Sequence, residues 1–205
     1  MTSGDKVPSL ERSVRACWLV ALLAAQSPVF GDTATRAWNL GALLGSLATR
    51  QQGTARFTEI RNLKVLTKPL RSSGMLSFHK PDVLEKRVTS PQPELLRVEG
   101  DRVTIDDGSP QSPRILQLSE HPEVAILIEA IRTPLTGNLD RLHALFQVSL
   151  GGSERRWLLS LVPRDPRAAE WVRSVYVRGS GDRVNAVEIE ERSGDRTVLH
   201  IEPMP

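Results

Sequence analysis

The sequence predicts an α+β protein built on one large antiparallel sheet, with helices covering one face of that sheet. Three observations lead to this prediction. The order of periodic segments is one helix, about five strands, two helices and four or five further strands. Short turns join consecutive strand-like segments, as antiparallel neighbours allow. No long linker and no internal repeat divides the chain.

The first 31 residues are predicted to be a signal peptide, which leaves residues 32–205 as a single exported domain. Three basic residues precede an uncharged and mostly apolar stretch at residues 16–25. A basic start, an apolar core of ~7–15 residues and a small-residue cleavage site form the secretory pattern. Ten helical residues rise only ~15 Å, about half the hydrocarbon core of a bilayer, so this stretch is too short to span one. The basic residues are Lys6, Arg12 and Arg15.

Cleavage after Ala25 or after Gly31 would remove Cys17, the only cysteine. The mature chain would then hold no disulfide, no thiolate nucleophile and no cysteine metal ligand. Without residues 1–31, 24 Lys and Arg face 22 Asp and Glu, with no basic block. We therefore expect no nucleic-acid partner. Aromatic residues make up only 4% of the chain while Leu, Val and Ile abound, which suits an aliphatic core or an apolar cavity.

The first half of the domain is expected to be one helix followed by strands. Residues 35–50 carry Trp38, Leu43, Leu47 and other apolar residues mostly at steps of three and four, which predicts a helix. Residues 54–66 change to a period of two, which predicts a strand. Proline or glycine turns then separate four more strands, and residues 107–113 form a loop. These four strands are predicted at residues 73–79, 83–89, 95–98 and 102–105.

The second half is expected to hold two helices and then strands again. Residues 122–132 present an apolar helical face, and Pro134 and Gly137 are expected to end that helix. Asn138 is a suitable N-cap for a third helix that continues to Phe146. From Val148 onward the pattern returns to a period of two, with glycine-containing turns between the segments. Strands are predicted at residues 157–162, 172–178, 184–191 and 196–201.

No catalytic or metal-binding motif stands out. The four histidines lie in different segments without helical i, i+4 pairing, so we expect no metal site. The chain has no Gly-x-Ser-x-Gly elbow, no phosphate-binding loop and no dinucleotide fingerprint. Asp106 and Asp107 form an acidic pair but lack the spacing of a calcium loop. We therefore expect a binding protein with no catalytic residues and no cofactor.

Several segments, in order, resemble the LolA-like family of periplasmic lipoprotein carriers. The run SSGMLSFHKP at residues 72–81 is similar to a family pattern in which glycine, leucine, an apolar residue (valine or phenylalanine) and a basic residue alternate with other residues and a proline follows. The matching residues are Gly74, Leu76, Phe78, Lys80 and Pro81. The run SPQPELLRVEGDRVTIDD at residues 90–107 is similar to a second family segment. In that segment a proline is followed, after a short gap, by two apolar strands that are joined by a turn of an acidic residue and glycine. Further similar segments are FTEIRNL at residues 57–63, WLLSLVP at residues 157–163 and VNAVEIEERSGDRT at residues 184–197.

This resemblance implies a half-barrel of about eleven antiparallel strands whose concave face is covered by helices, with an apolar cavity between them. It implies a monomeric periplasmic carrier for an acylated lipoprotein or other acyl lipid, which passes from an inner-membrane donor to an outer-membrane acceptor. Removing an acyl chain from water is favourable by ~0.8 kcal/mol per methylene, so such cargo needs shielding. The expected cavity-lining residues are Leu76, Phe78, Leu84, Leu96, Val98, Val103, Ile105, Leu127, Ile131, Leu159 and Leu161.

The resemblance also assigns a role to Lys80, which directly precedes the strand-ending Pro81. In the family, a basic residue at this position helps hold the helical lid closed, and it is more often arginine. The lysine ammonium is a compact charge, whereas the arginine guanidinium is planar and can form two parallel hydrogen bonds. The contacts that hold the lid closed are therefore expected to differ in this protein.

Two other functions remain open at this stage. The half-barrel also resembles the lipid-sensing domain of periplasmic regulators that bind an anti-sigma factor, which makes a regulatory sensor the alternative. An enzyme acting on lipid or glycan would have to use Asp106 and Asp107.

Overall fold

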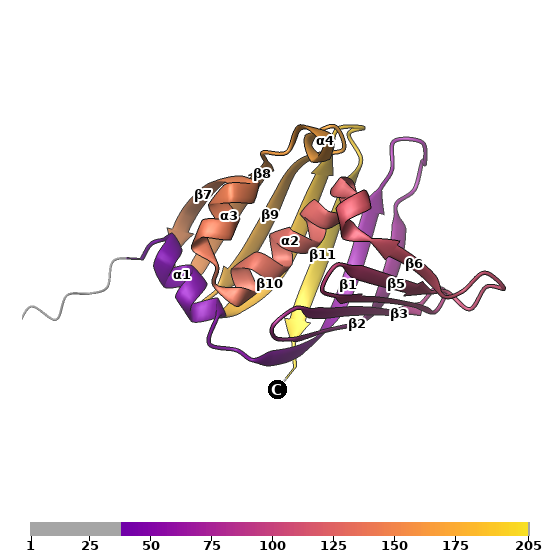
Figure 1. The fold of residues 1–205 in the computed structure, drawn as a ribbon, viewed down its shortest axis with the longest axis horizontal. Coiled ribbons are helices and arrows are strands. Elements are labelled where there is room, and N and C mark those ends of the chain that lie inside the picture. Colours follow the sequence, from indigo (N-terminus) through magenta and orange to yellow (C-terminus); the bar gives the residue numbers. More distant parts are fainter. Residues whose placement is uncertain (1–37, 205) are drawn as a thin grey trace, which may run out of the picture. The chain divides into compact units, whose positions relative to one another are not determined.

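A computed structural model describes residues 38–204, which form an eleven-stranded antiparallel sheet with helices on one face (Figure 1). The strand order is β6-β5-β4-β3-β2-β1-β11-β10-β9-β8-β7, so β1 joins the two halves of the chain. The predicted fold class and strand number are therefore confirmed. The predicted signal peptide at residues 1–31 lies outside the described residues. Within the described part, no helix is long and apolar enough to cross a membrane.

The first half follows the predicted order, with one strand that the sequence did not indicate. Residues 107–113 form the expected loop, but a short strand, β6, follows it. Its four residues are too few to show a period. The elements are α1 (Leu40–Leu47), β1 (Gln52–Asn62), β2 (Leu70–His79), β3 (Val83–Ser90), β4 (Glu94–Glu99), β5 (Arg102–Asp106) and β6 (Arg114–Gln117).

The second half contains the predicted helices and strands and two short helical turns that were not predicted, η1 and α4. Asn138 caps α3 as expected, since its Oδ1 accepts a hydrogen bond of 2.9 Å from the Arg141 amide. The elements are η1 (Leu118–Glu120), α2 (Pro122–Thr136), α3 (Leu139–Leu145), β7 (Phe146–Ser153), β8 (Arg156–Pro163), α4 (Pro166–Ala169), β9 (Val172–Ser180), β10 (Arg183–Glu191) and β11 (Arg196–Pro203).

Helix α2 ends before Gly137 as predicted, but the predicted last residue, 132, was wrong, because the helix continues through Pro134 to Thr136. Pro134 lies in the last turn, where its missing N–H removes only one helical hydrogen bond. The helix ends at Gly137, which adopts φ 75°. A side chain at Gly137 would also meet the Ala48 Cβ at 2.7 Å, so glycine permits both the left-handed turn and the close approach of the end of α1.

Two groups of buried side chains hold the helices against the sheet. The large core cluster joins α1, α2 and α3 to strands β7–β10 and contains Leu43, Leu142, Phe146 and Leu161. The small core cluster consists of Val98, Val103 and Leu118, and residues near the start of α2 pack on it. In Figure 1, α2 crosses the face of the sheet between these two regions. Helix α2 therefore covers the central strands of the sheet.

Candidate functional site

A cavity of about 560 Å³ lies between α2 and the central strands of the sheet. This volume is within the ~300–1,000 Å³ range of small-molecule sites. The helix contributes Leu127, Ile131, Leu135 and neighbouring residues to one wall. The sheet contributes apolar side chains from both halves of the chain to the other wall, including Leu76, Phe78, Leu84, Leu96, Val175, Val177, Val184, Val187, Ile189, Leu199 and Ile201.

Strand alternation explains why the sheet wall is apolar. Side chains two residues apart share a face, and register aligns them across strands. Ala55 on β1 pairs with Leu76 on β2, and Phe78, two residues further along β2, pairs with Leu84 on β3. Gly53 gives room for aromatic packing, because a Cβ there would approach the Phe78 ring to 2.6 Å.

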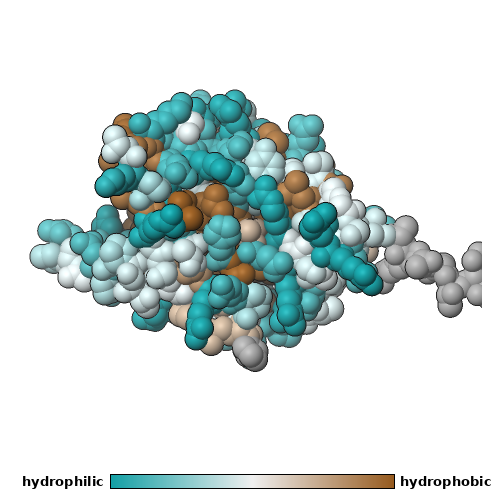
Figure 2. Space-filling model, turned by 180° about the vertical axis from the view of Figure 1, so that it is seen from behind, coloured by the Kyte–Doolittle hydropathy of each residue, from teal (hydrophilic) through white to brown (hydrophobic). Residues whose placement is uncertain are grey.

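The face of the molecule seen from behind in Figure 2 is more polar than this wall. Hydrophilic side chains in teal and side chains in white cover most of that face, with smaller groups of apolar side chains in brown among them.

Six of the eleven predicted cavity residues line this space. The sheet provides Leu76, Phe78, Leu84 and Leu96, and α2 provides Leu127 and Ile131.

The other five predicted residues do not line the cavity. Val98 and Val103 are fully enclosed in the small core cluster, and Ile105 packs against that cluster. Leu159 and Leu161 are fully enclosed in the large core cluster. Four of these side chains are fully buried among packed neighbours, and Ile105 is partly buried beside the small core cluster.

Sequence reasoning missed most of the cavity wall that comes from the second half of the chain. Val184, Ile189, Leu199 and Ile201 line the cavity and lie on β10 and β11. Alternation alone could have placed these side chains on one face of the sheet. Alternation could not show that β11 pairs with β1, which places the apolar side chains of β10 and β11 in the same cavity wall as Leu76 and Phe78.

One charged pair interrupts the sheet wall. Lys86 Nζ lies 2.6 Å from Glu59 Oε2, and Ser72 Oγ donates a 2.9 Å hydrogen bond to the same oxygen. Glu59 and Lys86 both line the cavity. Lys86 Nζ also lies 5.2 Å from the centre of the Phe57 ring.

A second ion pair lies at another part of the cavity wall. Arg50 Nη2 is 2.7 Å from Asp182 Oδ2, and both residues line the cavity. Met204 and Thr54 belong to the same wall. This pair joins the segment after α1 to the turn between β9 and β10, and it is partly exposed.

Lys80 connects the end of β2 to the end of α1. Its Nζ donates a hydrogen bond to the carbonyl oxygen of Ala48, the residue that follows α1. Its backbone amide donates to the Gln51 carbonyl at 2.9 Å. Ala48 in turn faces Gly137 at the end of α2. Lys80 therefore fixes the point where α1 and α2 meet.

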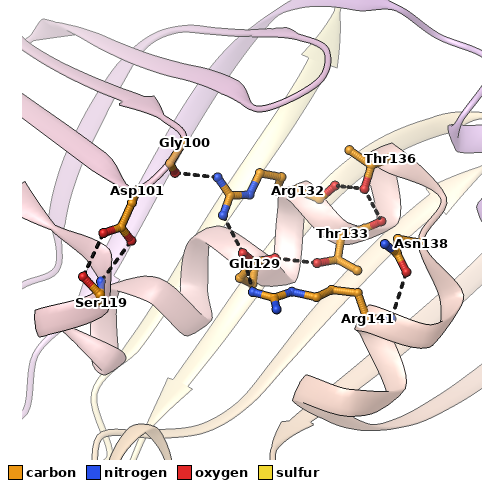
Figure 3. Close-up of polar contacts among 9 residues, drawn as sticks. All are labelled: Gly100, Asp101, Ser119, Glu129, Arg132, Thr133, Thr136, Asn138 and Arg141. Carbon is orange, nitrogen blue, oxygen red and sulfur yellow. Dashed lines mark hydrogen bonds and ion pairs between the residues drawn. The ribbon is translucent and has the colours of Figure 1, made fainter.

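Helix α2 is also bonded to the hairpin between β4 and β5 (Figure 3). Arg132 Nη1 donates a 2.8 Å hydrogen bond to the Gly100 carbonyl. Arg132 Nη2 lies 2.5 Å from Glu129 Oε1, and Arg141 on α3 lies 3.3 Å from the same oxygen. Thr133 Oγ1 donates to Glu129 Oε2 at 2.7 Å. This network links α2, α3 and the hairpin through one buried carboxylate.

The environment of Glu129 favours its charged form. Burial raises the pKa of this carboxyl, but hydrogen bonds from Arg132 and Thr133 and the charges of Arg132 and Arg141 lower it. The net effect is a pKa below the usual value of 4.5. Glu129 therefore stays ionised at neutral pH and holds both arginines.

The acidic pair that an enzyme would need has a structural role in a loop. Asp107 accepts hydrogen bonds from Ser112 Oγ at 2.6 Å and from the Ser109 amide at 3.0 Å. These bonds, with the Arg114 charge, hold the Asp107 pKa well below its usual range. Asp106 accepts from the Gly108 amide at 3.1 Å. Across residues 38–204, no three His, Cys, Asp or Glu side chains gather as a metal site.

The sequence match identifies the family. The family model described as outer membrane lipoprotein carrier protein LolA-like matches residues 32–200. The chain therefore belongs to this LolA-like family, and the resemblance seen in its motifs is confirmed. The family is a binding and carrier family. No curated protein matches the sequence.

Solved structures show a distant likeness. A LolA superfamily protein from Nitrosomonas europaea has 11% identity and a TM-score of 0.44, with 80% of this chain and 89% of that chain covered. A putative outer membrane lipoprotein-sorting protein domain from Vibrio parahaemolyticus has 12% identity and a TM-score of 0.41, with 79% and 88% covered. The Pseudomonas aeruginosa MucA/MucB complex gives 13% identity and a TM-score of 0.42, with 81% and 58% covered. All three scores lie below 0.5, so family membership rests on the sequence match.

Proposed function

We propose that this protein is a periplasmic carrier that shields acyl chains of a lipoprotein or other lipid on the way to the outer membrane. The observation that carries the proposal is the cavity of about 560 Å³ with an aliphatic wall on both sides. Water in such a space has few polar partners, whereas an acyl chain gains ~0.8 kcal/mol per buried methylene. Membership of the LolA-like family supports the same role.

The proposed binding residues are the six predicted side chains that line the cavity, together with the aliphatic residues of β10 and β11. Lys80 is proposed to hold the helices closed, through its bond to the end of α1. Opening would move α2, with the end of α1, away from the central strands and expose the aliphatic wall. We propose that the protein acts as a monomer and receives cargo from an inner-membrane donor.

A cavity-filling substitution tests the carrier function. Ala55 lies on the cavity wall between Leu76 and Pro203 in register, so Ala55→Trp would place a large ring in the space. Thr58→Trp is the matched control, because Thr58 is exposed on the same strand and does not line the cavity. We expect the wild type and Thr58→Trp to take up a fluorescent acyl probe and Ala55→Trp to lose at least tenfold in affinity.

Equal uptake by all three proteins would contradict binding in this cavity, and no uptake by the wild type would contradict the carrier function. Pull-down of a membrane-anchored regulator, with release on lipid addition, would instead support the sensor alternative.

A further inference from the structure

We propose that Glu59 and Lys86 form a polar subsite inside the cavity, which takes the neutral hydrogen-bonding linkage between an acyl chain and its headgroup. The inference rests on the proposed lipid-binding function and narrows its ligand class. It predicts cargo with an amide or a hydroxyl-bearing ester next to the chain, and it fixes which end of the cargo lies at this pair.

The placement of the pair is the first observation. Among the charged residues of the described chain that line the cavity, Glu59 is the buried one, at 7% exposed. Its neighbours in register are Ser72 on β2 and Leu199 on β11. Lys86 lies between Leu76 and Leu96 in register. The Glu59 carboxylate is therefore buried beside aliphatic side chains, and the Lys86 side chain, 26% exposed, reaches it from the neighbouring part of the wall.

The free hydrogen-bonding capacity of the pair is the second observation. An ammonium group has three donors, and within residues 38–204 Lys86 Nζ has a hydrogen bond only to Glu59. Glu59 Oε2 accepts from both Lys86 and Ser72, whereas Oε1 has no hydrogen-bond donor in that range. A ligand in the cavity would therefore find free donors on Lys86 next to a free acceptor on Glu59.

An ion pair in an apolar wall has an energetic cost that a polar ligand group would reduce. Removing charges from water is unfavourable, and mutual attraction offsets this only when the remaining donors and acceptors find partners. A purely hydrocarbon ligand would cover the pair and leave those groups unmet. An amide, which donates and accepts, can satisfy Glu59 Oε1 and Lys86 Nζ together.

The same arrangement discriminates against an anion. A carboxylate at Lys86 would lie beside the Glu59 carboxylate, and like charges at close range repel. A neutral linkage avoids this contact. The aliphatic walls on either side, formed by Leu76, Leu96 and Leu199, then accommodate the chain.

Competition binding with three ligands of equal chain length tests the subsite. Oleamide, oleate and octadecene would each displace a fluorescent acyl probe from the purified wild-type protein. We expect oleamide to compete about tenfold better than octadecene, as a hydrogen bond to a charged group implies. We also expect oleamide to compete better than oleate.

The double variant Glu59→Leu/Lys86→Met locates the preference. Replacing both members of a buried ion pair by apolar residues is often neutral for stability, so this variant is expected to fold. It should bind oleamide and octadecene alike. Arg178→Met is the matched control, because Arg178 pairs with Glu188 away from the cavity and should keep the wild-type ranking.

The outcomes separate the two proposals. If the wild type binds all three ligands equally, or prefers oleate, the subsite assignment is wrong while the carrier function stands. If the double variant keeps the preference for oleamide, the subsite lies elsewhere. If no ligand competes and the probe itself does not bind, the carrier function fails as well. The wild-type ranking decides the matter even if the double variant does not fold.

Discussion

The concave face of the sheet is filled over β8 and left open over β11, although both strands present leucines to it. Leu161 on β8 is fully buried in the large core cluster, to which α1 and α3 also contribute. Leu199 on β11 is partly buried and lines the cavity beneath α2. The two leucines have the same chemistry and the same alternation. What separates them is the packing above each side chain, which is close around Leu161 and leaves space beside Leu199.

The largest expected effect is on the filled side. Leu161→Ala should lower the free energy of unfolding by about 2–5 kcal/mol, because it leaves a void among fixed neighbours. Leu199→Ala should cost less than about 1 kcal/mol, since its side chain already borders open space. Urea unfolding of the two variants measures both. Equal losses of stability in the two variants would contradict the assignment of Leu161 to the core and of Leu199 to the cavity wall.

The next effect concerns the network that holds α2 over the open side. Glu129→Leu should destabilise the protein by about 3 kcal/mol, because it removes the partner of Arg132 and Arg141. Asp165→Asn provides a control, since asparagine can still cap α4 while the exposed ion pair with Arg167, which should contribute below about 1 kcal/mol, is lost. Thermal unfolding at neutral pH compares them. A loss at Glu129 no larger than at Asp165 would show that the network does not anchor α2.

Low pH should weaken the ion pairs that Glu129 forms with Arg132 and Arg141. The pKa of Glu129 is lower in the folded protein than its usual value of 4.5, so its contribution is fully present above that value. The contribution declines as the pH falls from about that value through the folded pKa. Glu129→Gln should therefore flatten the fall in Tm below pH 4.5. Glu188 also has a lowered pKa, first through its hydrogen bond from Arg196, so part of the acid sensitivity should remain. An unchanged pH profile in Glu129→Gln would contradict the assignment.

The smallest expected effect is at Lys80. Lys80→Met removes one hydrogen bond to the Ala48 carbonyl and should cost about 1 kcal/mol of stability. If Lys80 keeps the helices closed, amide hydrogen exchange should rise at the end of α1 and at the end of α2. Lys80→Arg should restore protection. Unchanged exchange in Lys80→Met would remove the proposed closing role.

Much of the fold could be predicted from the sequence, because each strand and helix carries its own local pattern. The alternation at residues 54–66 and the Asn138 cap are local signals, and both predicted elements exist. Pro134 misled the prediction because a proline in the last turn does not stop a helix. β6 and α4 have four residues each, too few for periodicity to appear.

The candidate site was only partly predictable. The motif containing Leu76 and Phe78 pointed to the cavity, and both side chains line it. Leu161 and Val98 have the same pattern but lie under packed side chains, which depends on tertiary structure. Glu59 was placed on a strand without a role, because its partner Lys86 lies 27 residues away in the sequence. Only the pairing of β1, β2 and β3 brings these charges together.

Native mass spectrometry of protein purified gently from the periplasm tests the central claim most directly, since it detects whether the cavity is occupied by lipid in the cell. We predict a bound acyl lipid on the wild type and on Thr58→Trp, and none on Ala55→Trp. Wild-type protein that is consistently free of lipid, or lipid retained equally by Ala55→Trp, would contradict the account.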